Sequence, residues 1–158
     1  MKQRILFLCT GNSARSQIAE ALLGLIAGDH FEADSAGTHP AGLNPMTVAS
    51  MHEIGVDVRH YRSKSLQEFV GQSFDYVITV CDRAKESCPI LPGAVTIRHW
   101  SFDDPAAAPV ESRLEVFRRI RYEIADRLCQ FLLEEVRVTP AALQCYCCSV
   151  QLEPDSAS

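Results

Sequence analysis

One short segment near the start of the chain constrains the fold more than any other. A buried-strand pattern over residues 5–8 leads without a break into Cys9-Thr10-Gly11-Asn12-Ser13-Ala14-Arg15-Ser16, and a helical pattern begins inside that segment. In a tight loop at a helix N-terminus the peptide N–H groups point at one spot, where the helix dipole favours negative charge. The sequence therefore predicts an oxyanion-binding loop, formed by residues 10–15, after the first strand.

Cys9 and Arg15 give this loop its predicted chemistry. The guanidinium of Arg15 offers a planar fork of donors that can grip two oxygens of one anion. A free cysteine has a pKa of about 8.5, and sites of this kind lower it to roughly 3.5–7.5. We therefore expect Cys9 to be a thiolate nucleophile aimed at a bound anion. A strand-end cysteine that only packs in the core is the alternative, which the polar residues beside Cys9 disfavour.

The composition is that of a soluble protein with one main domain. Its 158 residues suffice for a core without disulfides, and 47% of them are apolar. No apolar run approaches the roughly 20 residues needed to cross a bilayer. The net charge of −5 argues against a nucleic-acid partner. Seven cysteines without an export signal point to the reducing cytoplasm, where thiols are more often catalytic, redox-active or metal-binding than cross-linked.

Short apolar runs alternate with helical periodicity along the chain. Strands are predicted over residues 4–8, 31–35, 76–80 and 94–99. Helices are predicted over residues 14–27, 45–54, 65–70 and 110–136, with a further helical stretch that ends at Cys88. Strands separated by helices predict an α/β fold with three layers, a four-stranded parallel sheet and helices on both faces. This domain is expected to cover residues 1–137, and residues 138–158 to form a cysteine-containing C-terminal extension.

Two later cysteines carry the second chemical signal. Sites in parallel sheets gather at the carboxyl ends of the strands, so the residues that follow predicted strands are expected to share one rim. These residues are Cys9, Ser35, Cys81 and Trp100. If residues 81–88 are helical, the first and last Cα atoms lie roughly 10.5 Å apart, whereas a disulfide needs about 7 Å or less. Cys81 and Cys88 are therefore either a redox relay that pairs when the segment unwinds, or two unrelated core cysteines.

Three thiols near an oxyanion site favour reduction over plain hydrolysis. Cys9 would attack the central atom of the anion, and a second thiol would then attack Cys9. The central atom would leave with two electrons. Phosphorus cannot be reduced by a thiol in this way, whereas arsenic(V) can.

The same residues resemble a known family, the thioredoxin-coupled arsenate reductases built on the low-molecular-weight tyrosine phosphatase fold. The segment from Cys9 to Ser16 matches the Cys-x5-Arg-Ser phosphate loop, which the phosphatases share. Three further segments are similar to the reductase branch in particular: Val80-Cys81-Asp82, Cys88-Pro89-Ile90-Leu91-Pro92 and His99-Trp100-Ser101-Phe102-Asp103-Asp104-Pro105-Ala106. The similarity extends from Arg4 to about Leu133.

The resemblance implies roles for the loop and its surroundings. Cys9 is the nucleophile, Arg15 binds the oxyanion together with the loop amides, and a hydrogen bond from Ser16 holds Cys9 as thiolate. Asp104 is the general acid that protonates the departing oxygen, although the sequence alone does not separate Asp103 from Asp104. Arsenate is the implied substrate, with phosphate or sulfate as analogues.

The resemblance also implies a thiol relay. Cys81 attacks the Cys9–arsenate adduct and releases arsenite, and Cys88 then attacks the Cys9–Cys81 bond, which leaves a Cys81–Cys88 disulfide. Thioredoxin reduces that disulfide, no cofactor is bound, and the protein is expected to act as a monomer. A glutathione-linked carrier is the alternative reductant. None of the five histidines is assigned a role.

Two features depart from the family pattern. Three residues match a potassium site that some members contain: Asn12, Glu20 and Ser35. Lys64 lies where a further acidic ligand is expected, so its ammonium would replace the ion, and a plain surface lysine is the alternative. The cluster Cys145-Tyr146-Cys147-Cys148 has no counterpart in the family, and its two interpretations are metalloid trapping and a passive tail.

Two other functions would use parts of the same site. A phosphotyrosine phosphatase would use Cys9, Arg15 and Asp104 and pass through a phosphocysteine that water hydrolyses. It would need neither of the later two cysteines of the relay. A redox-sensing or anion-binding module would leave Asp104 and Ser16 without a task.

Overall fold

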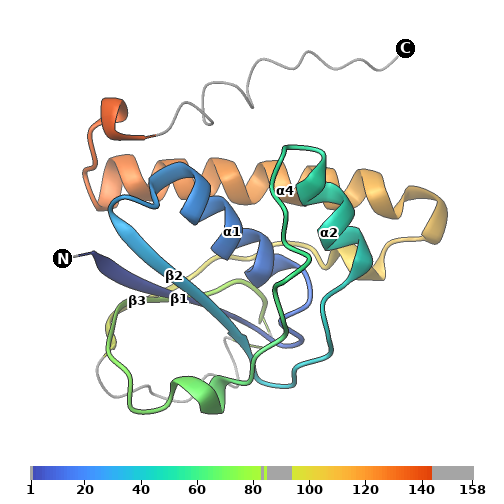
Figure 1. Ribbon diagram of the computed structural model, residues 1–158, viewed down its shortest axis with the longest axis horizontal. Helices are drawn as coiled ribbons and strands as arrows, with labels where there is room; N and C mark the ends of the chain where they lie inside the picture. Colours follow the sequence, from blue (N-terminus) through green and yellow to red (C-terminus); the bar gives the residue numbers. More distant parts are fainter. Residues whose placement is uncertain (1, 83, 85–93, 144–158) are drawn as a thin grey trace.

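The computed structural model describes residues 2–82, 84 and 94–143 of the chain (Figure 1). One sheet contains β1 (Gln3–Cys9), β2 (Phe31–Gly37), β3 (Phe74–Thr79) and β4 (Ala94–His99). Its strand order is β2-β1-β3-β4, and all three neighbouring pairs are parallel. The α-helices α1 (Arg15–Ala27), α2 (Pro45–His52) and α4 (Arg113–Gln130) connect or follow these strands. The predicted α/β fold with a four-stranded parallel sheet is confirmed.

The central strand β1 is buried on both faces because each face of the sheet packs against a separate apolar cluster. Helices α1 and α4 lie on one face of the sheet (Figure 1), and there Phe7 packs with Ile18 of α1 and Phe117 of α4. On the other face Leu6 packs with Leu66 of the 3-10 helix Leu66–Phe69. Each such side chain gains about 1.5–3 kcal/mol by leaving water. The two clusters hold the carboxyl end of β1, and the loop after it, in a fixed place.

Local signals in the sequence explain where the shorter helices begin. The Asn44 side chain caps α2 by accepting a hydrogen bond of 2.9 Å from the Met46 N–H, and Pro45 occupies the first turn. Ser65 and Glu68 form a capping box at the next helix. That helix was predicted over residues 65–70 and is a 3-10 helix of four residues. Strand β2 extends two residues beyond its predicted end, because Gly37 still pairs with the last residue of β1.

The prediction of one continuous helix over residues 110–136 is wrong in its details. A 3-10 turn, Val110–Ser112, precedes α4, and a π-helical turn, Phe131–Glu135, follows it. In that turn the Val136 N–H donates to the Phe131 carbonyl at 3.1 Å. The wider turn places Phe131 in the core, where its ring lies 5.5 Å from that of Trp100 and 5.0 Å from that of Tyr76. Tertiary packing therefore overrides the simple helical period here.

Some expectations fall on other parts of the chain. Val138 and Leu143, at the start of the predicted extension, pack against the main core. Cys88, most of the helical stretch before it, and the cluster Cys145, Cys147 and Cys148 lie outside the described residues. Among the helices that the structure describes, none has the length and apolar content required to cross a bilayer.

Candidate active site

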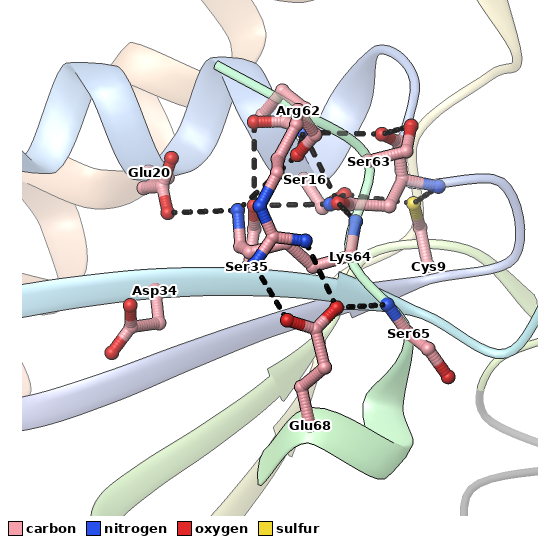
Figure 2. Close-up of polar contacts among 12 residues, drawn as sticks. Cys9, Ser16, Glu20, Asp34, Ser35, Arg62, Ser63, Lys64, Ser65 and Glu68 are labelled. Carbon is pink, nitrogen blue, oxygen red and sulfur yellow. Dashed lines mark hydrogen bonds and ion pairs between the residues drawn. The ribbon is translucent and has the colours of Figure 1, made fainter. Parts of the chain in front are cut away.

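The predicted oxyanion loop connects the end of β1 to the start of α1. Cys9 is the last residue of β1 and is 4% exposed, and α1 begins at Arg15. The Asn12 N–H donates to Cys9 Sγ at 3.0 Å, and Ser16 Oγ lies 2.8 Å from the same sulfur (Figure 2). The predicted contact between Ser16 and the nucleophile is present. Two polar groups thus hold the sulfur at the base of the loop.

Asn12 holds the loop in its unusual shape. It is fully buried and has a φ of 47°, a left-handed conformation that asparagine tolerates better than most residues. Its Nδ2 donates to Ser16 Oγ at 2.8 Å and to Ser35 Oγ at 3.0 Å. Its Oδ1 accepts from the Lys64 N–H at 2.8 Å. The side chains of Asn12 and Ser16 therefore support the backbone of the loop.

Sequence reasoning missed three residues that support the loop from behind. Gln17 Nε2 donates to Asn12 Oδ1 at 3.1 Å, and Ser63 Oγ donates to the Asn12 carbonyl at 2.7 Å. A Cβ on Gly37 would lie only 2.5 Å from the Thr10 carbonyl oxygen, so this position requires glycine. Ser63 is 51 residues from Asn12 along the chain, and no local pattern signals such a contact.

The Cys9 thiol is less acidic than the sequence suggested. Burial raises its pKa above the usual value, and this effect outweighs the hydrogen bonds from Ser16 and Asn12, which lower it. The expectation of a depressed Cys9 pKa is therefore wrong for the protein as described. A proton on Cys9 has to be taken up by a base, and a dianionic oxyanion in the loop is one.

Arg15 and Asp104 face each other across the site, and Asp103 does not join them. Arg15 Nη1 donates to the Phe102 carbonyl at 3.0 Å, and Arg15 Nη2 lies 3.9 Å from Asp104 Oδ1. Asp103 forms its ion pair with Arg119 of α4, at 3.2 Å. The structure thus separates two carboxylates that the sequence left equivalent, and Asp104 is the one paired with Arg15, the arginine predicted to bind the anion.

Cys81 shares a cavity with Cys9. The cavity has a volume of about 640 Å³ and is lined by Cys9, Thr10, Gly11, Ser13, Ala14, Arg15, Cys81, Asp82, Ser101, Phe102, Asp103, Asp104 and Ala106. Both cysteines are free thiols. Cys81 Sγ lies 3.4 Å from Thr10 Oγ1 and accepts a hydrogen bond from the Ala84 N–H, also at 3.4 Å. The prediction that Cys9 and Cys81 meet at one rim is confirmed.

The other two residues expected at that rim lie elsewhere. Trp100 packs into the core against Phe131, and it does not line the cavity. Ser35 lies within β2, behind the oxyanion loop, because that strand extends further than predicted. Expectations based only on strand ends therefore place these two side chains wrongly.

Lys64 and Glu20 form a mostly buried ion pair behind the loop (Figure 2). Lys64 Nζ lies 3.7 Å from Glu20 Oε1, and both side chains are less than 15% exposed, at 14% and 12%. Burial raises the pKa of Glu20 to about 7, although Lys64 acts in the opposite direction. Within residues 2–82, 84 and 94–143, no three His, Cys, Asp or Glu side chains gather in a way that would hold a metal ion.

Comparison with known proteins identifies the family. Residues 4–141 match the low molecular weight phosphotyrosine protein phosphatases. The chain belongs to this family. An arsenate reductase from Shouchella clausii (strain KSM-K16) is 42% identical over 132 residues, which cover 82% of this chain and 95% of the relative.

Solved structures extend the comparison within the low-molecular-weight phosphatase family. An arsenate reductase in a phosphate-binding state has a TM-score of 0.72 and 25% identity, and it covers 84% of this chain and 98% of its own. A thioredoxin-dependent arsenate reductase from Corynebacterium glutamicum has a TM-score of 0.62 and 30% identity, with 85% of this chain and 64% of that chain covered. The fold is therefore shared with reductases as well as phosphatases.

Proposed function

We propose that this chain reduces arsenate to arsenite in the cytoplasm, with thioredoxin as its reductant. The observation that carries the proposal is the pair of free thiols, Cys9 and Cys81, in the wall of one oxyanion-binding cavity. A phosphatase of this fold requires only the first of them. The relatives named arsenate reductase, one of them thioredoxin-dependent, support the same assignment.

The first step joins arsenic to Cys9. The loop amides and Arg15 bind the oxyanion, which takes the proton of the buried Cys9 thiol as it enters. Cys9 Sγ then attacks arsenic, an As–O bond breaks, and Asp104 protonates the departing oxygen so that water leaves. The oxidation state of arsenic does not change in this step.

The second step transfers the electrons. The Cys81 thiol gives its proton to an arsenic-bound oxygen and its sulfur attacks Cys9 Sγ. An S–S bond forms and the S–As bond breaks, and the electron pair of that bond stays on arsenic, which leaves as arsenite. Cys88 then attacks Cys81 Sγ and releases the Cys9 thiolate, so that a Cys81–Cys88 disulfide remains. Thioredoxin reduces this disulfide by exchange and thereby supplies the two electrons that arsenic received.

The decisive experiment measures NADPH oxidation with arsenate, thioredoxin and thioredoxin reductase. The wild-type protein is expected to oxidise NADPH only when arsenate is present. Cys88→Ser is expected to stop after one turnover, because Cys81 has no partner to which it can pass the disulfide. Hydrolysis of p-nitrophenyl phosphate by the same variant serves as its control and should be unchanged. Continued turnover of Cys88→Ser with thioredoxin would refute the relay.

Phosphomonoester hydrolysis is the second candidate function, supported by Cys9, Arg15 and Asp104 and by membership of the phosphatase family. It would proceed through a phosphocysteine that water hydrolyses. Efficient hydrolysis of aryl phosphates with no arsenate-dependent NADPH oxidation would favour it. Weak hydrolysis beside arsenate reduction would not, since both reactions start with the same nucleophile.

We also propose that Lys64 makes a potassium ion unnecessary. The Lys64 ammonium already pairs with the Glu20 carboxylate, so the residues around Glu20 do not fit a potassium ion in addition to the lysine. Turnover is expected to be equal in sodium and potassium buffers at the same ionic strength. Strong activation by potassium would contradict this part of the proposal.

A further inference from the structure

A histidine close to Cys81 takes no part in the steps above. His99 ends β4 and lies opposite Thr79, which ends β3. Its Nδ1 lies 2.7 Å from Thr79 Oγ1, and its Nε2 lies 3.0 Å from Asp82 Oδ1. Asp82 directly follows Cys81 in the chain. The imidazole therefore connects the strand ends to the segment that carries the second thiol.

These contacts determine which ring nitrogen of His99 carries a hydrogen. A carboxylate only accepts hydrogen bonds, so Nε2 carries the hydrogen that it donates to Asp82. The Thr79 hydroxyl can either donate to Nδ1 or accept from it, which suits the neutral ring as well as the imidazolium. The link between His99 and Asp82 is therefore compatible with both charge states.

Hydrogen bonds hold the chain on both sides of Cys81, and Asp82 accepts those on the C-terminal side. On the near side, the Val80 N–H donates to the Leu8 carbonyl at 2.8 Å. On the far side, Ser101 Oγ donates to the same Asp82 oxygen as His99, at 3.3 Å. The Asp82 side chain is 74% exposed, so these two donors are what draws it toward the cavity wall.

We propose that His99 is a positioning residue for Cys81. By holding Asp82, it keeps the Cys81 thiol buried at the cavity wall, within 3.4 Å of the Thr10 hydroxyl. The structural part of this proposal is independent of the reaction, whereas its catalytic consequence rests on the relay proposed above. Because the Asp82 carboxylate is largely exposed, we expect this hydrogen bond to have the net strength of an ordinary one, which shifts a population by about threefold to tenfold.

The test compares variants of the full-length protein that differ in one contact. In His99→Gln the side-chain amide occupies the place of Nε2 and can still donate a hydrogen bond to Asp82. In His99→Asn the shorter amide occupies the place of Nδ1, so the contact with Asp82 is lost. Asp82→Ala removes the acceptor. Alkylation of Cys81 by iodoacetamide, followed by peptide mass, is expected to be about threefold to tenfold faster in His99→Asn and in Asp82→Ala. The His99→Gln rate and every Cys9 rate should match the wild type.

Activity gives the second readout. In His99→Asn, kcat for arsenate reduction is expected to fall by about threefold to tenfold at unchanged KM, with unchanged p-nitrophenyl phosphate hydrolysis. The double variant with Asp82→Ala should behave like either single variant. Unchanged alkylation in His99→Asn, additive effects, an equal effect of His99→Gln, or a parallel loss of hydrolysis would each overturn the proposal. If the wild type reduces no arsenate, the relay is refuted, and the alkylation rates alone decide the role of His99.

Discussion

The two sulfur atoms in the cavity are held very differently. Cys9 receives hydrogen-bond partners at 3.0 and 2.8 Å, and the side chains behind them, Asn12 and Ser16, are fully buried. Cys81 has its contacts at 3.4 Å, and the residue after it is 74% exposed. The first half of the site is thus a rigid network of short contacts, whereas in the second half longer contacts hold a thiol that is equally buried, at 4% exposed, but that precedes an exposed residue.

This difference suits the two kinds of chemistry that we propose for the cavity. Binding an oxyanion benefits from donors that are already in place and do not move during the reaction. Disulfide exchange requires one sulfur to approach another and then a third, so a thiol in this role has to move. The rigid half fits the first task and the lightly held half fits the second. If so, changes on the Cys81 side should spare hydrolysis.

The largest effect that separates the two halves is expected from the cysteines themselves. Cys81→Ser should abolish multiple-turnover arsenate reduction, because it removes the thiol proposed to attack the Cys9 adduct. Its hydrolysis of p-nitrophenyl phosphate should stay within about twofold of the wild type. Cys9→Ser should lose both activities. Loss of hydrolysis in a folded Cys81→Ser protein would break the comparison, since the two halves would then not be separable.

The next largest effect is expected from the two neighbouring carboxylates. Asp104→Asn should slow p-nitrophenyl phosphate hydrolysis by about 10²–10⁴-fold, the usual contribution of a general acid. Asp103→Asn is the matched control: its ion pair with Arg119 is exposed, and such pairs contribute about 0–1 kcal/mol. The measurement is the initial rate of p-nitrophenyl phosphate hydrolysis by each variant at the same pH. Equal rates in the two variants would show that the Arg15 contact does not mark the acid.

The buried network around Cys9 should also contribute to the stability of the folded protein. Asn12→Ala removes an amide that hydrogen-bonds to buried polar groups. Alanine also tolerates the φ of 47° at this position less well than asparagine does. We expect a loss of about 2–4 kcal/mol in the free energy of unfolding. Asn12→Gly keeps the backbone free of strain and should lose about 1 kcal/mol less. Urea titrations of both variants measure the free energy of unfolding. If Asn12→Ala lost less unfolding free energy than a typical surface substitution does, the network behind the loop would not be important for stability.

The sequence predicted the contiguous part of the site well, but it did not predict contacts between segments that are far apart in the chain. The strand, the loop and α1 are contiguous, so the local pattern from residue 5 onward was enough to predict the loop and to place Cys9 and Arg15 at its two ends. The supports of the loop come from distant segments: Ser63 and Lys64 reach Asn12 only because the sheet brings them there. No local pattern reveals such contacts.

Two other outcomes depended on packing rather than on pattern. Asp103 and Asp104 became distinguishable through their different partners: Arg119, 16 residues away on α4, pairs with Asp103, and Arg15 pairs with Asp104. The π-helical turn after α4 arises where Phe131 meets Trp100 in the core, so the periodicity of residues 110–136 could not predict it. Local chemistry was therefore easier to predict than long-range geometry.

The smallest expected effect concerns Glu20, at the back of the rigid half. Burial raises the pKa of this carboxyl to about 7 in the folded protein, above its ordinary value of 4.5. The folded state then binds a proton more tightly than the unfolded state. Glu20 therefore contributes stability that is fully present below pH 4.5 and is lost as the pH rises through 7.

Glu20→Gln isolates this contribution because the amide has nearly the same shape and does not titrate. Between pH 5 and 8 the wild type is expected to lose about 2 kcal/mol of unfolding free energy relative to the variant. Glu32→Gln, at an exposed position of β2, should follow the wild type and serves as control. Urea titrations at the two pH values measure the difference. If the wild type and Glu20→Gln differ by the same amount at both, then the Lys64 ammonium keeps Glu20 ionised throughout, and the ion pair is a permanent part of the network behind Cys9.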